Sequence, residues 1–277
     1  MEEKARLMIE SFNSMGYDAV GIGDDDLTLG KEFLLEISKK ANFPFLSSNL
    51  VDEASGKNLF QPSLIKEIHG LRIGVFSLFS PDLFTNSSDP RKKGLNIRPP
   101  IEVAQTTVKE LKPKTDLIIL LSHLGYAKDI ELAQSVQGIN IIVGGHTGIN
   151  LIYPLVIKNT IILQTASRGM FAAKLDLLFH SNEPVFYNSA TKVSLENNLK
   201  NLNQRLNAQE TPEAEKAQLE KAREEIERTL NQIQTKNLFT NHIIPLQEQM
   251  KEDPDIKKLV EAYKAKTQTT ANPVSPK

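Results

Sequence analysis

Cysteine and tryptophan are both absent from this chain of 277 residues. Without cysteine there are no disulfides, thiolate zinc sites, iron–sulfur clusters or cysteine nucleophiles, so any metal must be held by His, Asp, Glu or Asn. Long apolar runs are also absent. The longest unbroken ones, such as 117–121, are far shorter than the ~20 residues that span a bilayer, so no transmembrane helix is expected.

Neither sign of charge is in excess. The chain carries 33 Lys and Arg against 34 Asp and Glu, a formal net charge of −1. No long-range field therefore draws it to nucleic acid or to an anionic membrane, and nucleic acid is not an expected partner. The start, Met1-Glu2-Glu3-Lys4, is charged and leads into a helical pattern, unlike a secretory signal. As written, the chain has no signal peptide and is expected in the cytoplasm.

Short apolar runs alternate with amphipathic stretches over the first 180 residues, the order of a layered α/β domain. Helical spacing predicts helices over 4–15, 33–37, 100–111 and 129–136. Strands are expected at 19–22, 43–47, 64–68, 71–78, 116–122, 139–143, 155–157, 160–164 and 174–179. Ligands of such folds gather outside the carboxyl ends of the strands, so the loops after Ile22, Leu121 and Val143 are expected to form one shared site.

Beyond residue 193 the pattern changes. Leucines at 195, 199, 202 and 206 recur at helical spacing, and a second amphipathic stretch rich in Glu, Lys and Arg follows Pro212. The sequence thus predicts a domain over 1–193 and an α-helical hairpin, a short coiled coil, over 194–236. A strand and helix segment is expected over 237–266, in which residues 261–266 close the last helix, and a disordered tail is expected over 267–277.

Three segments carry residues suited to chemistry: Gly-Asp-Asp-Asp-Leu-Thr-Leu-Gly at 23–30, Ser-His-Leu-Gly at 122–125 and Gly-Gly-His-Thr-Gly at 144–148. On these motifs, in this order, and on 42–50, 129–133 and Gln164-Thr165, the chain resembles the 5′-nucleotidase family of metallophosphoesterases. The resemblance covers roughly residues 4–179. It implies the calcineurin-like phosphoesterase fold, an α/β β-sandwich flanked by helices.

The resemblance also implies a hydrolase in which two metal ions activate a water and clamp phosphate oxygens. His123 and His146 match the family's two metal-binding histidines, and Asp24 takes the place of its metal-binding asparagine. Arg168 is the best placed cation for an anionic substrate, a nucleotide or another phosphate ester. These matches predict a metal site made of Asp24, His123 and His146.

Several positions depart from the family pattern. Asp25 replaces the family's catalytic histidine, and a carboxylate repels the negative charge that develops in phosphoryl transfer. Thr28 stands where an aspartate orients that histidine, and Gly148 replaces a further ligand. No Asp-x-His segment precedes Ala19, so the domain is expected to lack its first metal-binding motifs. We therefore expect no catalytic residue and one divalent ion (Zn, Mn or Fe) in place of two.

Other interpretations of these residues stay open. His123 and His146 are equally well explained as hydrogen-bonded loop histidines. Asp24, Asp25 and Asp26 are also explained as caps of the helix that follows. Arg168 has a competing interpretation as a surface residue.

Three hypotheses on function follow. The first is a 5′-nucleotidase-like metallophosphatase domain with a degenerate site and weak or lost activity. The second is a non-catalytic binding or assembly module that self-associates through the helical hairpin. The third is a part of a longer product whose upstream segment supplies the missing ligands. The resemblance adds that proteins of this family are often periplasmic or secreted.

Overall fold

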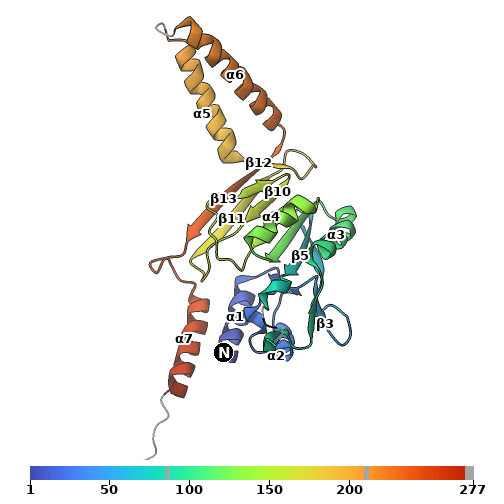
Figure 1. Cartoon of the computed structure of the whole chain (residues 1–277). Helices are drawn as coiled ribbons and strands as arrows, with labels where there is room; N and C mark the ends of the chain where they lie inside the picture. The colour runs from blue at the N-terminus through green and yellow to red at the C-terminus, as the bar shows by residue number, and fades with distance from the viewer. Residues whose placement is uncertain (85, 87, 209–211, 272–277) are drawn as a thin grey trace, which may run out of the picture. The chain divides into compact units, whose positions relative to one another are not determined.

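A six-stranded mixed sheet is the centre of the first of two units in the computed structural model, which describes residues 1–84, 86, 88–208 and 212–271 (Figure 1). The strand order is β4-β5-β7-β8-β10-β9, with β4 and β9 antiparallel to their neighbours. The sequence patterns predict all six strands to within two residues at each end. Their bounds are β4 Ser63–Ile68, β5 Leu71–Phe79, β7 Leu117–His123, β8 Ile141–Gly144, β9 Leu155–Ile157 and β10 Thr160–Leu163.

Two helices cover one face of this sheet. α3 (Pro100–Leu111) and α4 (Tyr126–Ser135) pack on alternate residues of the strands, as the period of two requires. α4 begins three residues earlier than the sequence predicts, because Gly125 adopts a φ of 93° and turns the chain into the helix just after His123. The buried cluster includes Phe76, Leu78, Ala104, Val108, Leu111, Ile118, Leu120, Leu132, Ala133, Ile142 and Ile162.

A short parallel strand pair lies against the other face. β1 (Val20–Gly21) pairs with β2 (Phe45–Leu46), and α1 (Glu2–Met15) and α2 (Lys31–Ser38) supply apolar side chains to the same core. A Cβ at Gly21 would lie only 2.6 Å from Ser77 Oγ and 3.1 Å from Leu121 Cβ. Glycine at this position therefore allows β1 to approach the sheet closely, and this approach fixes the loop that follows β1.

A buried asparagine ties this layer to the end of β5. Asn49 is fully buried; its Nδ2 donates to Phe79 O at 2.7 Å and Arg98 O at 3.1 Å, and its Oδ1 accepts from Phe79 N at 2.8 Å. Asn49→Ala would leave these backbone groups unpaired, so we expect it to lower the free energy of unfolding by about 2–3 kcal/mol.

Urea denaturation of wild type and Asn49→Ala measures this loss. Asn96→Ala, on an exposed side chain of β6 (Leu95–Ile97), is the matched control and is expected to change stability by no more than about 0.5 kcal/mol. Equal stability of the two variants would contradict the structural role of Asn49.

The second unit comprises residues 152–154 and 171–244. Its sheet has the order β11-β13-β12, built from β11 (Phe171–Leu178), β12 (Phe186–Asn188) and β13 (Asn237–Pro245). Helices α5 (Ser189–Leu206) and α6 (Glu213–Ile233) pack against each other, as Figure 1 shows. β11 therefore lies in the second unit, whereas the sequence predicts the end of the first domain at residue 193.

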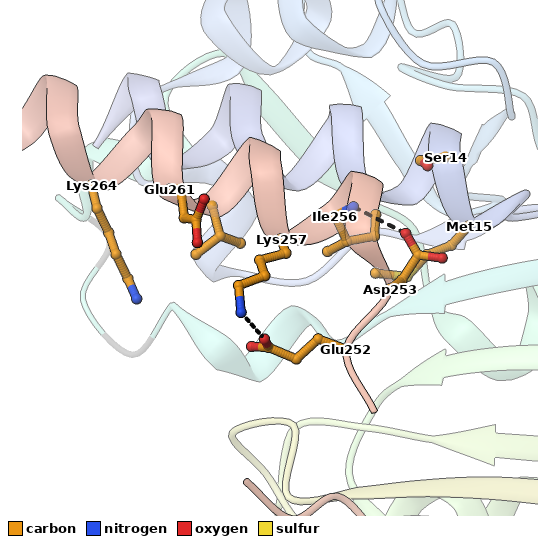
Figure 2. Close-up of a pocket in the computed structure, with 9 residues that line it drawn as sticks. Ser14, Met15, Glu252, Asp253, Ile256, Lys257, Glu261 and Lys264 are labelled. Atoms are coloured by element: carbon orange, nitrogen blue, oxygen red, sulfur yellow. Dashed lines mark hydrogen bonds and ion pairs between the residues drawn. The ribbon is translucent and has the colours of Figure 1, made fainter. Parts of the chain in front are cut away.

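The chain returns to the first unit with α7 (Pro254–Ala271), which lies beside α1. Figure 2 shows a pocket of about 660 Å³ between the two helices, lined by Met15 and Ile256 among others. The sequence places the end of the last helix at 261–266, and the structure extends this helix from Pro254 to Ala271. Asp253 accepts hydrogen bonds from two N–H groups of the first turn and Pro254 follows it, and these are the start signals of a helix.

The prediction of a disordered tail over 267–277 is wrong for its first five residues. Residues 267–271 continue α7, and residues 272–277 lie outside the described part of the chain. The structure adds a strand pair that the sequence does not predict, β3 (Leu50–Asp52) with β6. No helix among the described residues combines the length and apolar character needed to cross a membrane. Short 3-10 helices complete the fold: η1 Asp25–Leu27, η2 Pro81–Leu83, η3 Pro90–Lys92 and η4 Lys112–Lys114.

Candidate metal centre

Three side chains able to bind a metal follow the carboxyl ends of three strands. Asp24 lies three residues beyond β1, His123 is the last residue of β7, and His146 lies two residues beyond β8. β7 and β8 are parallel neighbours, so their loops emerge at the same edge of the sheet. The structure thus brings together the three residues that the sequence predicts as ligands.

The three ligand atoms lie within 4.8 Å of one another. Asp24 Oδ1 is 2.9 Å from His123 Nε2 and 3.9 Å from His146 Nδ1. Asp24 and His123 are half-buried, whereas His146 is exposed. Two imidazole nitrogens and one carboxylate oxygen make a donor set that suits Zn²⁺, Mn²⁺ or Fe²⁺. The cluster therefore fits one divalent ion, and it is the one such group among the residues that the structure describes.

Neighbouring groups hold His123 in place. Its ring stacks on Phe79, with ring centroids 6.0 Å apart and planes 22° apart. The two histidine rings meet edge to face at 5.1 Å. A Cβ at Gly23 would lie 2.9 Å from His123 Cε1, so glycine before Asp24 leaves room for the ring. The Phe79 ring on one side and the lack of a side chain at Gly23 on the other thus define the position of the His123 imidazole.

The Asp24 carboxylate is held in its charged form. Burial alone would raise its pKa, but the hydrogen bond and charge of His123 and the charge of His146 lower it, and the net pKa shift is downward. An ionised carboxylate is the form that binds a metal. The lowered pKa thus keeps Asp24 in the ionised state that a metal ligand requires.

The other oxygen of Asp24 has a partner that the sequence does not indicate. Arg91, in η3, places Nη1 3.1 Å from Asp24 Oδ2. Its Nη2 and Nε bind Asp89, the nearest distance being 2.8 Å, and its guanidinium carbon lies 5.4 Å from the centre of the Phe84 ring. Asp89 also caps η3 by accepting from Arg91 N at 3.0 Å. Arg91 is therefore a fixed cation at the edge of the centre.

Asp25 and Asp26 do not cap the following helix, contrary to one interpretation of the sequence. Neither η1 nor α2 has a side-chain cap. Asp26 Oδ2 instead accepts from Gly23 N at 2.8 Å, while the Asp25 side chain is 99% exposed and 4.0 Å from Arg91. Thr28 Oγ1 donates to Asp25 O at 2.6 Å. These contacts shape the loop that carries Asp24.

Gln164 supports the loop that carries His146. With its amide oxygen turned toward that loop, it accepts from Gly148 N and Ile149 N, each at 3.2 Å, and from Thr147 Oγ1 at 3.0 Å. Gly148 and His146 both have positive φ, 65° and 70°. Gln164 is 3% exposed, so its interactions are shielded from water and brace an unusual backbone. The motif Gln164-Thr165 singles out Gln164 in the sequence, but no sequence pattern indicates that its side chain supports the loop of His146.

The structure does not place Arg168 among the three ligands. It is exposed in the loop after β10, where its φ is 67°. The contact of Arg168 with an anionic substrate stays a prediction.

A buried carboxyl lies behind the centre. Asp129, in α4, is fully buried, and its Oδ1 accepts a hydrogen bond from the hydroxyl of Ser122, next to His123. Its Oδ2 has no hydrogen-bond partner among the described residues. Burial raises the pKa of Asp129 to about 7, against a smaller opposing effect of the Ser122 hydrogen bond. This side chain links α4 to the strand that carries His123.

Comparison with curated proteins identifies relatives of this chain, although no family model matches it. A 5′-nucleotidase of Vibrio cholerae is 30% identical over 205 residues, which cover 63% of this chain. The chain is thus similar, over part of its length, to curated proteins named 5′-nucleotidase. It spans only 37% of the Vibrio 5′-nucleotidase.

Solved structures share the fold at lower identity. A 5′-nucleotidase precursor from Thermus thermophilus superposes with a TM-score of 0.68 at 22% identity, over 96% of this chain and 46% of that one. A sulfate thiohydrolase from Thermus thermophilus gives 0.69 at 19% identity, over 95% and 39%. The mixed α/β fold of 5′-nucleotidases is thus shared, and it also occurs in an enzyme with another substrate. Fold alone therefore does not fix the reaction.

Proposed function

We propose that this chain is a 5′-nucleotidase-like metallophosphatase domain that binds one divalent ion and hydrolyses phosphate esters weakly or not at all. The observation that carries the proposal is the convergence of Asp24 Oδ1, His123 Nε2 and His146 Nδ1 at the ends of three strands. Relatedness to 5′-nucleotidases favours nucleotides among the phosphate esters.

The chemistry expected of the centre follows from its donor set. A bound divalent ion would act as a Lewis acid and lower the pKa of a coordinated water. The chain's own residues hold the ligands: Phe79 packs on one imidazole and Gln164 braces the loop of the other. Asp25, by contrast, exposes a negative charge beside the centre where the family resemblance places a histidine. That charge disfavours the build-up of negative charge on a phosphoryl group, so we propose that activity is weak.

A phosphatase assay tests the proposal. The full chain, loaded with Zn²⁺ or Mn²⁺, is assayed against nucleoside monophosphates and a generic phosphate ester. We expect slow or undetectable hydrolysis, and any activity should be lost in the double variant His123→Ala, His146→Ala. Robust turnover that survives both replacements would contradict the proposal.

The second candidate is a binding or assembly module that uses α5 and α6. Leu195 and Leu199 of α5 are half-buried, whereas Leu219 and Ile233 of α6 are buried. The two helices already contact each other, and the leucines of α5 stay partly open to a second copy. Sedimentation of the full chain at several concentrations distinguishes the candidates, because a concentration-dependent dimer would favour the assembly module.

A further inference from the structure

The Asp24 carboxylate has two different cation partners available to its two oxygens. Oδ1 lies next to both histidines, at 2.9 and 3.9 Å, whereas Oδ2 binds Arg91 Nη1 at 3.1 Å. A divalent ion bound by the histidines would share this carboxylate with a guanidinium. The two cations would therefore act on one ligand from opposite sides.

Arg91 is held firmly enough to act as a permanent charge. Its side chain is 27% exposed, its Nε and Nη2 bind Asp89, and the guanidinium lies against Phe84. The carboxylates of Asp89 and Asp24 raise the pKa of Arg91 further above its already high ordinary value, so it stays charged. An arginine cannot leave the site by deprotonation. Only movement of η3 or substitution can remove its charge from Asp24.

We propose that Arg91 is a resident cation that competes with the divalent ion for Asp24 and so sets the metal concentration at which the centre fills. This inference rests on the proposed function, since it concerns the regulation of the same site. Like charges repel, and at the edge of a protein this repulsion is screened by water but not abolished. Arg91 thus lowers the affinity of the site, while Asp89, which balances Arg91, raises it.

Co²⁺ binding to the full chain tests this inference without any assay of activity. The dissociation constant is measured from the visible absorption of bound Co²⁺ and by calorimetry. Arg91→Met keeps an apolar contact with Phe84 but removes the charge, so we expect Co²⁺ binding at least about tenfold tighter than in wild type. Arg91→Lys keeps the charge and is expected to stay within about threefold of wild type.

Two further variants complete the test: one is expected to change the Co²⁺ affinity in the opposite direction, and the other is a control. Asp89→Asn removes a compensating negative charge and is expected to weaken Co²⁺ binding by about tenfold. Arg72→Met removes an arginine that forms the same kind of ion pair, with Asp116, away from the centre, and should leave the affinity unchanged. The gain in Arg91→Met should also shrink at high salt, because salt screens charges.

The outcomes separate this inference from the proposed function. If Arg91 merely orients Asp24, both Arg91→Met and Arg91→Lys weaken binding, as loss of an outer-shell partner does, and the competition is refuted. If wild type and Arg91→Met bind Co²⁺ with the same affinity, the competition is also refuted, but the metal site is supported. Failure of both wild type and Arg91→Met to bind Co²⁺ contradicts the metal site itself.

Discussion

Replacement of Asp129 by asparagine is expected to stabilise the protein at pH 8 and to have little effect at pH 4. Asp129 is fully buried with a pKa raised to about 7, whereas an unfolded chain gives it an ordinary pKa of about 3.9. The folded state therefore holds this proton more tightly than the unfolded state. The contribution of Asp129 to stability is greatest below pH 4 and falls as the pH rises from about 4 to 7.

The size of the effect follows from the pKa difference. About three pKa units correspond to roughly 4 kcal/mol, which is an upper limit because the introduced amide would have its own buried hydrogens to satisfy. Urea denaturation of wild type and Asp129→Asn from pH 4 to 8 measures the difference in unfolding free energy at each pH. The difference should grow through this range and level off above pH 7.

Ser122→Ala is a second test of this prediction. The Ser122 hydrogen bond lowers the pKa of Asp129, so its loss should steepen the fall in stability of the folded protein between pH 4 and 8. A constant difference between wild type and Asp129→Asn at all pH values would show that Asp129 does not titrate with a raised pKa.

Replacement of either histidine should all but remove metal binding. His123→Ala and His146→Ala each leave only two of the three donors, and two donors hold a Zn²⁺ or Co²⁺ ion poorly. We expect each replacement to weaken Co²⁺ binding by at least about 100-fold, beyond the 10- to 100-fold typical of outer-shell changes. Visible absorption of bound Co²⁺ reports the loss directly.

His242→Ala is the control for the histidine variants. His242 is exposed on β13, 3.4 Å from Asp176, and belongs to the second unit. This variant should bind Co²⁺ with wild-type affinity. Equal binding by His123→Ala and wild type would mean that the two imidazoles and Asp24 are hydrogen-bonded loop residues and nothing more.

The sequence predicts the shared site because its three loops follow strands, and the resemblance to 5′-nucleotidases singles out Asp24, His123 and His146 as the ligands within those loops. The apolar run 117–121 and the segment 139–143 mark strands, and the residues just beyond them come together wherever parallel strands end. The same patterns place all six strands of the central sheet. A local signal is sufficient in these cases because it reflects the geometry of the sheet itself.

Arg91 and Asp129 could not be predicted in the same way. Arg91 meets Asp24 across 67 positions of sequence, so only the folded chain brings the ion pair together. Asp129 sits in an amphipathic helix, where a carboxylate normally faces water, and its burial depends on the packing of α4 against the sheet. The sequence does not predict β3 and β6 because a polar residue, Asp52 or Asn96, interrupts each of these three-residue strands, whereas β9 is equally short but wholly apolar.

The metal content of the full chain is the most direct test of a single-ion centre. The protein is equilibrated by dialysis against Zn²⁺ or Mn²⁺, and the bound metal is measured by mass spectrometry against protein concentration. We predict one ion per chain in wild type and none in the double variant His123→Ala, His146→Ala. Two tightly bound ions per chain, or one ion that survives the loss of both histidines, would contradict the account.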